Sequence, residues 1–308
     1  MKEQWNALHI FYHDMTKYDS LILTVNDEMN RYVDLQLIEK WFFIRYWEGG
    51  PHIRLRYFPK DKDEEIRQKI EEKVRLFWKT LPIEQVLTKE DYYANHPFDG
   101  EKKSMEELPW FDNRSIKSIP YVPEIERYGG AESIKYSESI FMYSSQLVCY
   151  LLKATKPDSA KKFILALTLT KLLIEELLCF DEQEDLIQYA TFYKQYWEPF
   201  VEGNRTNDLL HLFSANKNSI GKFYEALKTN QVVQSYFAKM VFELNNVRTI
   251  INDELYIHRI VASHIHMTNN RLGISPFVEY YISEYISKNY PNQAVKNEVD
   301  KLEKIARI

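Results

Sequence analysis

The chain has 308 residues, of which 45% are hydrophobic and 15% aromatic, and its formal net charge is −5. This length can bury a substantial core in one large domain or two intimate ones. A protein that coats nucleic acid normally carries an excess of basic residues. This chain has no such excess, so we expect no direct nucleic-acid partner. No apolar run approaches the ~18 residues of a membrane span, and the N-terminus lacks the apolar core of a signal peptide, so we expect a cytoplasmic protein.

The first third of the chain predicts a mixture of strands and helices. Strands are expected at 5–13, 40–47 and 51–58, and helices at 19–38 and 61–80. The last two strands form a β-hairpin around Gly49-Gly50-Pro51, because glycine permits positive φ and proline keeps its predecessor out of the α region. The expected apolar stripe of the second helix consists of Ile66, Ile70, Val74 and Phe77.

The rest of the chain is mainly helical. Residues 82–130 show no sustained period and predict a long connection that carries short strands. Helices are expected at 131–154, 158–180, 183–199, 218–228 and 231–251. Gly273 can close a further helix, and Pro276 suits the first turn of the last one. The sequence therefore predicts an α+β fold in one domain, 1–308, with an α+β part at 1–130 and a mainly helical part at 131–308.

Several kinds of site lack their sequence motifs here. Cys149 and Cys179 lie in apolar helical patterns and are expected to be buried free thiols. There is no GxGxxG, complete P-loop, HExxH, GxSxG or EF-hand motif. Histidines 258, 264 and 266 do not suggest a metal site, because positions 264 and 266 of a helix point roughly 200° apart. We therefore expect no metal.

The first polar stretch is "PHIRLRY". His52, Arg54 and Arg56 alternate with apolar residues, so all three lie on one face of the predicted strand. Guanidinium groups hold carboxylates or phosphates through two parallel hydrogen bonds and stay charged at any relevant pH. On its own, however, this stretch favours a solvated outer face over an anion clamp.

Two more polar stretches follow. "YVPEIERYGG" (121–130) places Arg127 beside acidic residues, with which it can simply pair. "HIHMTNNRLG" (264–273) places His266 and Asn270 on one helix face and Arg271 beside Met267. Histidine is suited to proton transfer near neutral pH, although a lone helical histidine is more often structural.

Together, "WFFIRYWEGGPHIRLRY", "PEIERYGG" and "HMTNNRLG" resemble the small C-terminal domain of class I lantibiotic dehydratases. This domain also occurs alone, as the thiopeptide-type bacteriocin biosynthesis family. In the family a larger domain transfers glutamate from glutamyl-tRNA to Ser or Thr of a ribosomal precursor peptide. The small domain then removes the glutamate by β-elimination, which leaves dehydroalanine or dehydrobutyrine. The chain is too short for the glutamylating part, so the resemblance implies a separate tRNA-dependent glutamylating dehydratase subunit as partner.

The resemblance also implies roles for particular residues. Catalytic roles are implied for Arg56, Arg127 and His266, and substrate-binding roles for Arg54, His52 and Arg271. Within these, Arg54 binds the glutamyl group, and Arg56 and Arg127 bind the substrate and stabilise developing charge. His266 transfers a proton, and His52 orients a neighbour. The residue that takes the Cα proton is not identified. No cofactor is implied, since elimination is redox-neutral. Formation of a homodimer stays an open possibility.

Two alternatives remain. Enzymes of the same fold join two dehydroamino acids in a formal [4+2] cycloaddition that forms the pyridine ring of thiopeptides. They tend to depart from the arginine and histidine set that matches here, so the resemblance favours elimination. The other alternative is a non-catalytic module that presents the precursor peptide to the partner subunit.

Overall fold

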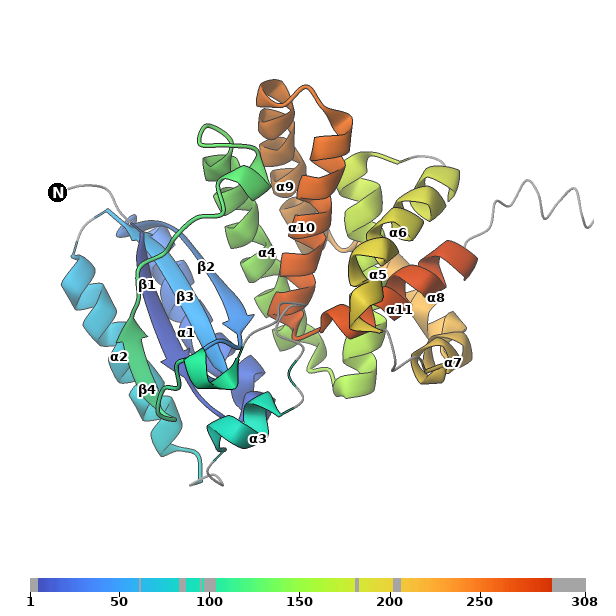
Figure 1. The fold of residues 1–308 in the computed structure, drawn as a ribbon. Coiled ribbons are helices and arrows are strands. Elements are labelled where there is room, and N and C mark those ends of the chain that lie inside the picture. The colour runs from blue at the N-terminus through green and yellow to red at the C-terminus, as the bar shows by residue number, and fades with distance from the viewer. Residues whose placement is uncertain are drawn as a thin grey trace, which may run out of the picture. The chain divides into compact units, whose positions relative to one another are not determined.

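The computed structural model describes residues 5–60, 62–82, 87–94, 96, 104–180, 183–201 and 206–289 (Figure 1). The chain forms two compact units, each described here by itself. The first contains the described residues up to Lys156 together with Phe242–Asn252 and Asn270–Gly273. The second contains Pro157–Val241, Asp253–Asn269 and the described residues from Ile274 onward. The predicted α+β class is confirmed, and the single domain stays a prediction.

The first unit combines a small sheet with helices. Its elements are β1 (Asn6–Phe11), η1 (Met15–Lys17), α1 (Tyr18–Asp34), β2 (Ile38–Tyr46), β3 (His52–Pro59), α2 (Asp63–Lys79), α3 (Lys89–Tyr93), η3 (Met105–Glu107), β4 (Ser115–Ser118), η4 (Glu126–Tyr128) and α4 (Ile134–Thr155). The described part of 82–130 holds only one strand, β4, so the expectation of several short strands is wrong there.

The second unit is helical. Its elements are α5 (Ser159–Leu178), α6 (Gln183–Trp197), η5 (Glu198–Phe200), α7 (Asp208–Ala215), α8 (Lys217–Thr229) and α11 (Pro276–Asn289), while α9 (Gln231–Ile250) and α10 (Glu254–Leu272) contribute residues to both units. Helix α11 packs against α5, α6 and α7, and is buried along most of its length. None of the described helices is both long and apolar enough to cross a membrane.

The sheet of the first unit is antiparallel, with strand order β2-β3-β1-β4. One face carries apolar side chains of β3 and is covered by two helices. The indole Nε1 of Trp41 donates to Asn30 of α1 at 3.1 Å, and the Tyr57 hydroxyl donates to Asp63 of α2 at 3.0 Å. The opposite face therefore carries the polar residues of β3.

The buried stripe of α2 differs from the prediction in one residue. Ile66, Ile70 and Val74 are buried as expected, but the fourth position is Trp78, and Phe77 is only half-buried. A repeat of four residues places Trp78 directly after Val74 on the same stripe. Its ring also stacks 6.3 Å from that of Tyr12. The larger aromatic residue thus occupies the core position.

The hairpin turn is held by a residue from much later in the chain. Gly49 and Gly50 have φ values of 92° and 100°, which favour glycine. Both of their amides donate to the hydroxyl oxygen of Tyr93 in α3, at 2.9 and 3.2 Å. The start of β3 is therefore fixed by a tertiary contact as well as by turn chemistry.

Helix α10 closes at Gly273, as predicted, and its end is a Schellman motif. Gly273 has φ 86°, its amide donates to the Asn270 carbonyl at 2.9 Å, and the Ile274 amide donates to the Asn269 carbonyl at 2.9 Å. In the first unit, the Asn270 side chain accepts from the Arg45 amide at 2.9 Å and donates to the Arg45 carbonyl at 3.0 Å. This end of the helix is thus hydrogen-bonded to the backbone of β2.

The two cysteines have different environments. Cys149 is buried in α4, as predicted, but Cys179 is exposed, so its predicted burial is wrong. The apolar pattern of α5 ends one residue earlier, at Leu178, and Cys179 adopts a left-handed conformation with φ 55° as the helix terminates. Cys179 is therefore open to solvent.

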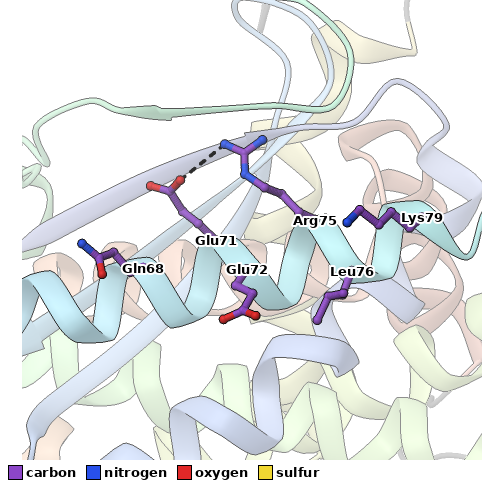
Figure 2. A pocket seen from close by; sticks show the side chains of 6 residues that line it. All are labelled: Gln68, Glu71, Glu72, Arg75, Leu76 and Lys79. Carbon is purple, nitrogen blue, oxygen red and sulfur yellow. Dashed lines mark hydrogen bonds and ion pairs between the residues drawn. The ribbon is translucent and has the colours of Figure 1, made fainter.

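A shallow hollow lies along the outer face of α2 (Figure 2). It is lined by Gln68, Glu71, Glu72, Arg75, Leu76 and Lys79. Figure 2 shows one ion pair there, between Arg75 and Glu71 at 3.4 Å, which is an ordinary pair four residues apart on a helix. None of the predicted site residues lines this hollow.

Candidate functional site

The polar face of the sheet gathers three predicted residues. Strand register pairs Arg56 with Phe42 and Ala7, Arg54 with Ile44 and His9, and His52 with Tyr46 and Phe11. We call the side that His52, Arg54 and Arg56 share the arginine face. His52 is 0% exposed and both arginines are partly buried, so the solvated outer face that this stretch alone favours is wrong.

His52 is a neutral acceptor in this arrangement. Burial, reinforced by Arg54 and Arg56, lowers the pKa of His52 to about 3, although the Gly50 carbonyl opposes the shift. Nδ1 lies 2.8 Å from the Gly50 carbonyl oxygen, and Nε2 accepts from Nε of Arg54 at 3.2 Å. A neutral ring satisfies both contacts only if Nδ1 carries the proton. His52 therefore orients the Arg54 guanidinium.

The two strand arginines lie against aromatic rings. The Arg54 guanidinium carbon is 3.4 Å from the Tyr46 ring centre, and that of Arg56 is 4.3 Å from the Tyr121 ring centre. Burial lowers the pKa of both arginines, and at about 10 the pKa of Arg56 still leaves it a cation at neutral pH. Nε of Arg56 is buried without a hydrogen-bond partner among the described residues. These cations are poorly solvated, which strengthens their attraction for an anion.

Arg271 is a third cation of the same unit. It is 0% exposed, and its Nε donates to the hydroxyl oxygen of Ser145 at 2.9 Å. Within the described part of the chain, its Nη1 and Nη2 have no hydrogen-bond partner. Burial lowers the pKa of Arg271 to about 9; the hydroxyl of Tyr128 opposes this shift and the charge of Arg56 adds to it. The charge of Arg56 thus acts on both Arg54 and Arg271, and Arg56 and Arg271 have buried donors without hydrogen-bond partners among the described residues.

Arg127 lies on the segment that flanks the arginine face. It belongs to η4, its side chain is 40% exposed, and it forms an ion pair with Glu124 at 2.9 Å. This is the simple acid pairing that the sequence allows. The charge of Glu124 also acts on Arg54 and Arg56, raising the pKa of each against the effect of burial. Arg127 is thus coupled to the arginine face through a shared carboxylate.

His266 lies in the second unit, on α10. Its Nδ1 is 2.7 Å from Oε1 of Glu279 in α11, which is fully buried, and the Trp197 ring lies 4.6 Å away between ring centres. The other oxygen of Glu279, Oε2, accepts from the Tyr193 hydroxyl and from Nδ2 of Asn269, the latter at 3.1 Å. Around His266 the structure therefore provides a histidine–carboxylate pair within a hydrogen-bonded network.

The structure brings some of the predicted residues together. His52, Arg54, Arg56 and Arg271 lie in one unit and interact through hydrogen bonds or charge. His266 belongs to the other unit. That His266 and the arginines form one site stays a prediction.

Three further residues were missed by the sequence-based reasoning. His9 stacks on His52 with ring centres 4.9 Å apart, and burial lowers its pKa to about 2. Glu138 is hydrogen-bonded to Trp5 and Tyr121, and burial raises its pKa. Glu279 supports His266. Alternation along β1 could have revealed His9, since a strand beside β3 places every second residue on the same face. The two glutamates gave no local signal.

The described residues include no group of three or more His, Cys, Asp or Glu side chains that could hold a metal ion.

Comparison with solved structures identifies the fold. A pyridine synthase, TbtD, from thiomuracin biosynthesis matches 94% of this chain and 97% of its own, with a TM-score of 0.65 and 17% identity. The tRNA-dependent lantibiotic dehydratase MibB from Microbispora sp. 107891 matches over 96% of this chain and 28% of its own, with a TM-score of 0.62 and 16% identity. At these identities the likeness establishes the fold alone.

Sequence comparison identifies the family. The epidermin biosynthesis protein EpiB of Staphylococcus epidermidis is 24% identical over 289 residues, which are 91% of this chain. The chain spans about a quarter of the length of that relative, since the match covers 25% of it. Residues 5–290 match the family described as lantibiotic biosynthesis dehydratase, C-terminal part. The chain therefore belongs to the family of lantibiotic dehydratase C-terminal domains.

Proposed function

We propose that the chain is a carbon–oxygen lyase that removes glutamate by β-elimination from glutamylated Ser or Thr of a ribosomally made precursor peptide. The observation that carries this proposal is a group of poorly solvated arginines, Arg54, Arg56 and Arg271, in which Arg56 interacts with the other two through charge and in which Arg56 and Arg271 have unmet donors among the described residues. Membership of the lantibiotic dehydratase family supplies the class of substrate.

The reaction needs positive charge at two places. Loss of the Cα proton gives an enolate-like amide, and cleavage of the Cβ–O bond releases glutamate as a carboxylate while the Cα=Cβ double bond forms. Fixed cations aimed at developing negative charge provide a large part of many enzymatic rate enhancements. The glutamyl group also carries a free carboxylate, which a guanidinium can hold with two hydrogen bonds.

The arrangement of the arginines supports separate roles. Arg54 binds the glutamyl group. Its guanidinium is already oriented for this by the hydrogen bond to the neutral His52. Arg56, which is partly exposed, stabilises the charge that develops on the substrate, and the fully buried Arg271 adds its positive charge from a distance. Arg127 exchanges its partner Glu124 for substrate, which its exposure allows.

His266 transfers a proton in this proposal. Its side chain is 16% exposed, so substrate can reach the ring, and its Nδ1 is occupied by Glu279. The proposed elimination implies two partners. One is a precursor peptide, which is the substrate, and the other is a separate tRNA-dependent dehydratase subunit that attaches the glutamate.

One experiment tests the proposal directly. The purified protein is incubated with a synthetic peptide that carries a glutamyl ester on Ser, and the products are followed by mass spectrometry. We expect free glutamate and dehydroalanine, with Arg56→Ala reducing the rate by about 10²-fold or more. Arg75→Ala, which removes a surface arginine of α2, is the matched control and should keep full activity. Glutamate that stays attached while the peptide binds would refute the proposal.

A pyridine-forming [4+2] cyclase is the second candidate. It is favoured by the likeness to TbtD, which extends over nearly the full length of both chains. This activity requires a peptide that already contains dehydroalanines and azoles, and the reaction releases the leader segment. Supplying such a peptide alongside the glutamylated one distinguishes the two reactions. A non-catalytic presenting module would process neither, and His266→Ala would then leave the modification state of the peptide unchanged.

A further inference from the structure

The network around Glu279 fixes which of its partners can donate. An ionised carboxylate only accepts hydrogen bonds. Burial, and then the charge of Glu279, raise the pKa of the Tyr193 hydroxyl well above its usual value, so this hydroxyl keeps its proton and donates to Oε2. Nδ2 of Asn269 also donates to Oε2. Both contacts to that oxygen are therefore donor contacts to a carboxylate.

The Asn269 amide has a second partner, the hydroxyl of Thr170. Its Nδ2 donates to the hydroxyl oxygen of Thr170 at 3.1 Å, and the Thr170 hydroxyl contacts Oδ1 at 3.4 Å. Asn269 and Thr170 are both buried, at 0% exposure. The Thr170 hydroxyl can donate or accept, so it is the Glu279 carboxylate that requires the amide nitrogen on its side and makes the opposite assignment of oxygen and nitrogen unfavourable.

We propose that Glu279 is a positioning residue that selects the tautomer of His266. With Oε1 as acceptor at 2.7 Å, Nδ1 carries the proton, and the lone pair of Nε2 is the site through which the ring accepts a proton. When Nε2 is protonated, the buried carboxylate compensates the positive charge of the imidazolium. The Trp197 ring, 4.6 Å from the imidazole, limits other orientations. The proposal rests on the proposed elimination for the reaction that this proton serves, but the tautomer itself is independent of it.

The test uses the full chain labelled with ¹⁵N-histidine and no substrate. Long-range ¹H–¹⁵N correlation spectra, recorded with the ring neutral, distinguish the two tautomers, and His266→Gln identifies the signals of His266. We expect Nδ1 to carry the proton in the wild type. Glu279→Gln should reduce the population of this tautomer and, with a glutamylated peptide, reduce kcat about 10²- to 10⁴-fold while KM changes little.

A matched control is available on the same helix. Glu284 is another largely buried carboxylate of α11, and it pairs with Lys194 at 2.6 Å. Glu284→Gln should leave both the His266 tautomer and kcat unchanged. If Glu279→Gln does not fold, Tyr193→Phe removes only one donor to Oε2 and should keep the Nδ1-protonated tautomer.

The outcomes separate this inference from the proposed function. A wild-type spectrum with the proton on Nε2 would overturn the role of Glu279, as would an unchanged tautomer in folded Glu279→Gln. If Nδ1 carries the proton in the wild type and Glu279→Gln shifts it, the assignment stands. Failure of the same protein to release glutamate would then refute only the elimination.

Discussion

Replacing Arg271 by methionine should stabilise the protein. The guanidinium is 0% exposed, and two of its nitrogens lack hydrogen-bond partners among the described residues. Methionine is apolar and flexible, and although it is shorter than arginine it can fill the space of the apolar arginine stem. Its partner Ser145 stays satisfied, because it also accepts from the Phe43 amide at 3.3 Å and donates to the Phe141 carbonyl at 2.8 Å. The substitution therefore removes a buried charge without leaving a new unmet group.

The magnitude follows from the pKa of Arg271. Burial is the main cause of its fall from 12.5 to about 9. At about 1.4 kcal/mol per pKa unit, keeping this group charged in the folded protein costs about 5 kcal/mol. The unfolded chain retains its proton up to pH 12.5, so the full cost applies below pH 9 and is relieved as the pH rises through 9 toward 12.5. The lost hydrogen bond to Ser145 offsets about 1 to 3 kcal/mol. These figures leave a net gain of about 2 to 4 kcal/mol at neutral pH.

Urea denaturation of the full chain at neutral pH measures this gain. Wild type, Arg271→Met and Arg271→Lys are compared, and an unchanged m value would show that the shift in midpoint reflects stability. Arg271→Lys keeps a buried charge and should bring no gain. A midpoint for Arg271→Met at or below that of the wild type would refute the reasoning. Loss of elimination activity in the more stable variant would indicate that the charge is kept for function.

Two further predictions concern acid and thiol chemistry. Burial lowers the pKa of His52 from 6.5 to about 3 and that of His9 to about 2, so between pH 6.5 and 3 the unfolded chain binds protons that the folded chain does not. The free energy of unfolding should fall as the pH drops through this window, and His52→Asn should flatten its pH dependence in urea titrations; an equally steep profile would contradict this. Iodoacetamide should modify one thiol of the native protein, the exposed Cys179, and two after denaturation, because burial raises the pKa of Cys149 and shields it. Two adducts on the native protein would show that Cys149 is accessible.

Local patterns in the sequence predicted the elements of the arginine face. Period-two alternation and the Gly-Gly-Pro turn were sufficient to put His52, Arg54 and Arg56 on one side of β3, because side chains of a strand alternate by geometry alone. The burial of that side could not be predicted, since it depends on contacts from other segments, such as that of Tyr121 with Arg56, and Tyr121 comes from a segment with no regular period. Short-range signals also missed α7, whose eight residues offer little room for a helical repeat.

Partners that are distant in the chain explain the remaining differences. His266 was selected from its motif, but Glu279, thirteen residues later and on the next helix, was not, because no spacing rule links residues on opposite sides of a turn. Arg271 was expected to bind substrate, yet its complete burial depends on how the last turn of α10 contacts α4. The sequence therefore indicated which residue types matter, and tertiary packing decided which atoms remain available.

The contact between Tyr93 and the two glycine amides has a consequence for engineering the hairpin. A designer who transfers residues 38–59 to another scaffold would carry over the arginines and the glycines but not the hydroxyl that orders them. The turn would then keep its sequence and lose its fixed geometry. Mutational libraries that aim to change the substrate should accordingly treat Tyr93 as part of the hairpin, although it lies more than forty residues away in the chain.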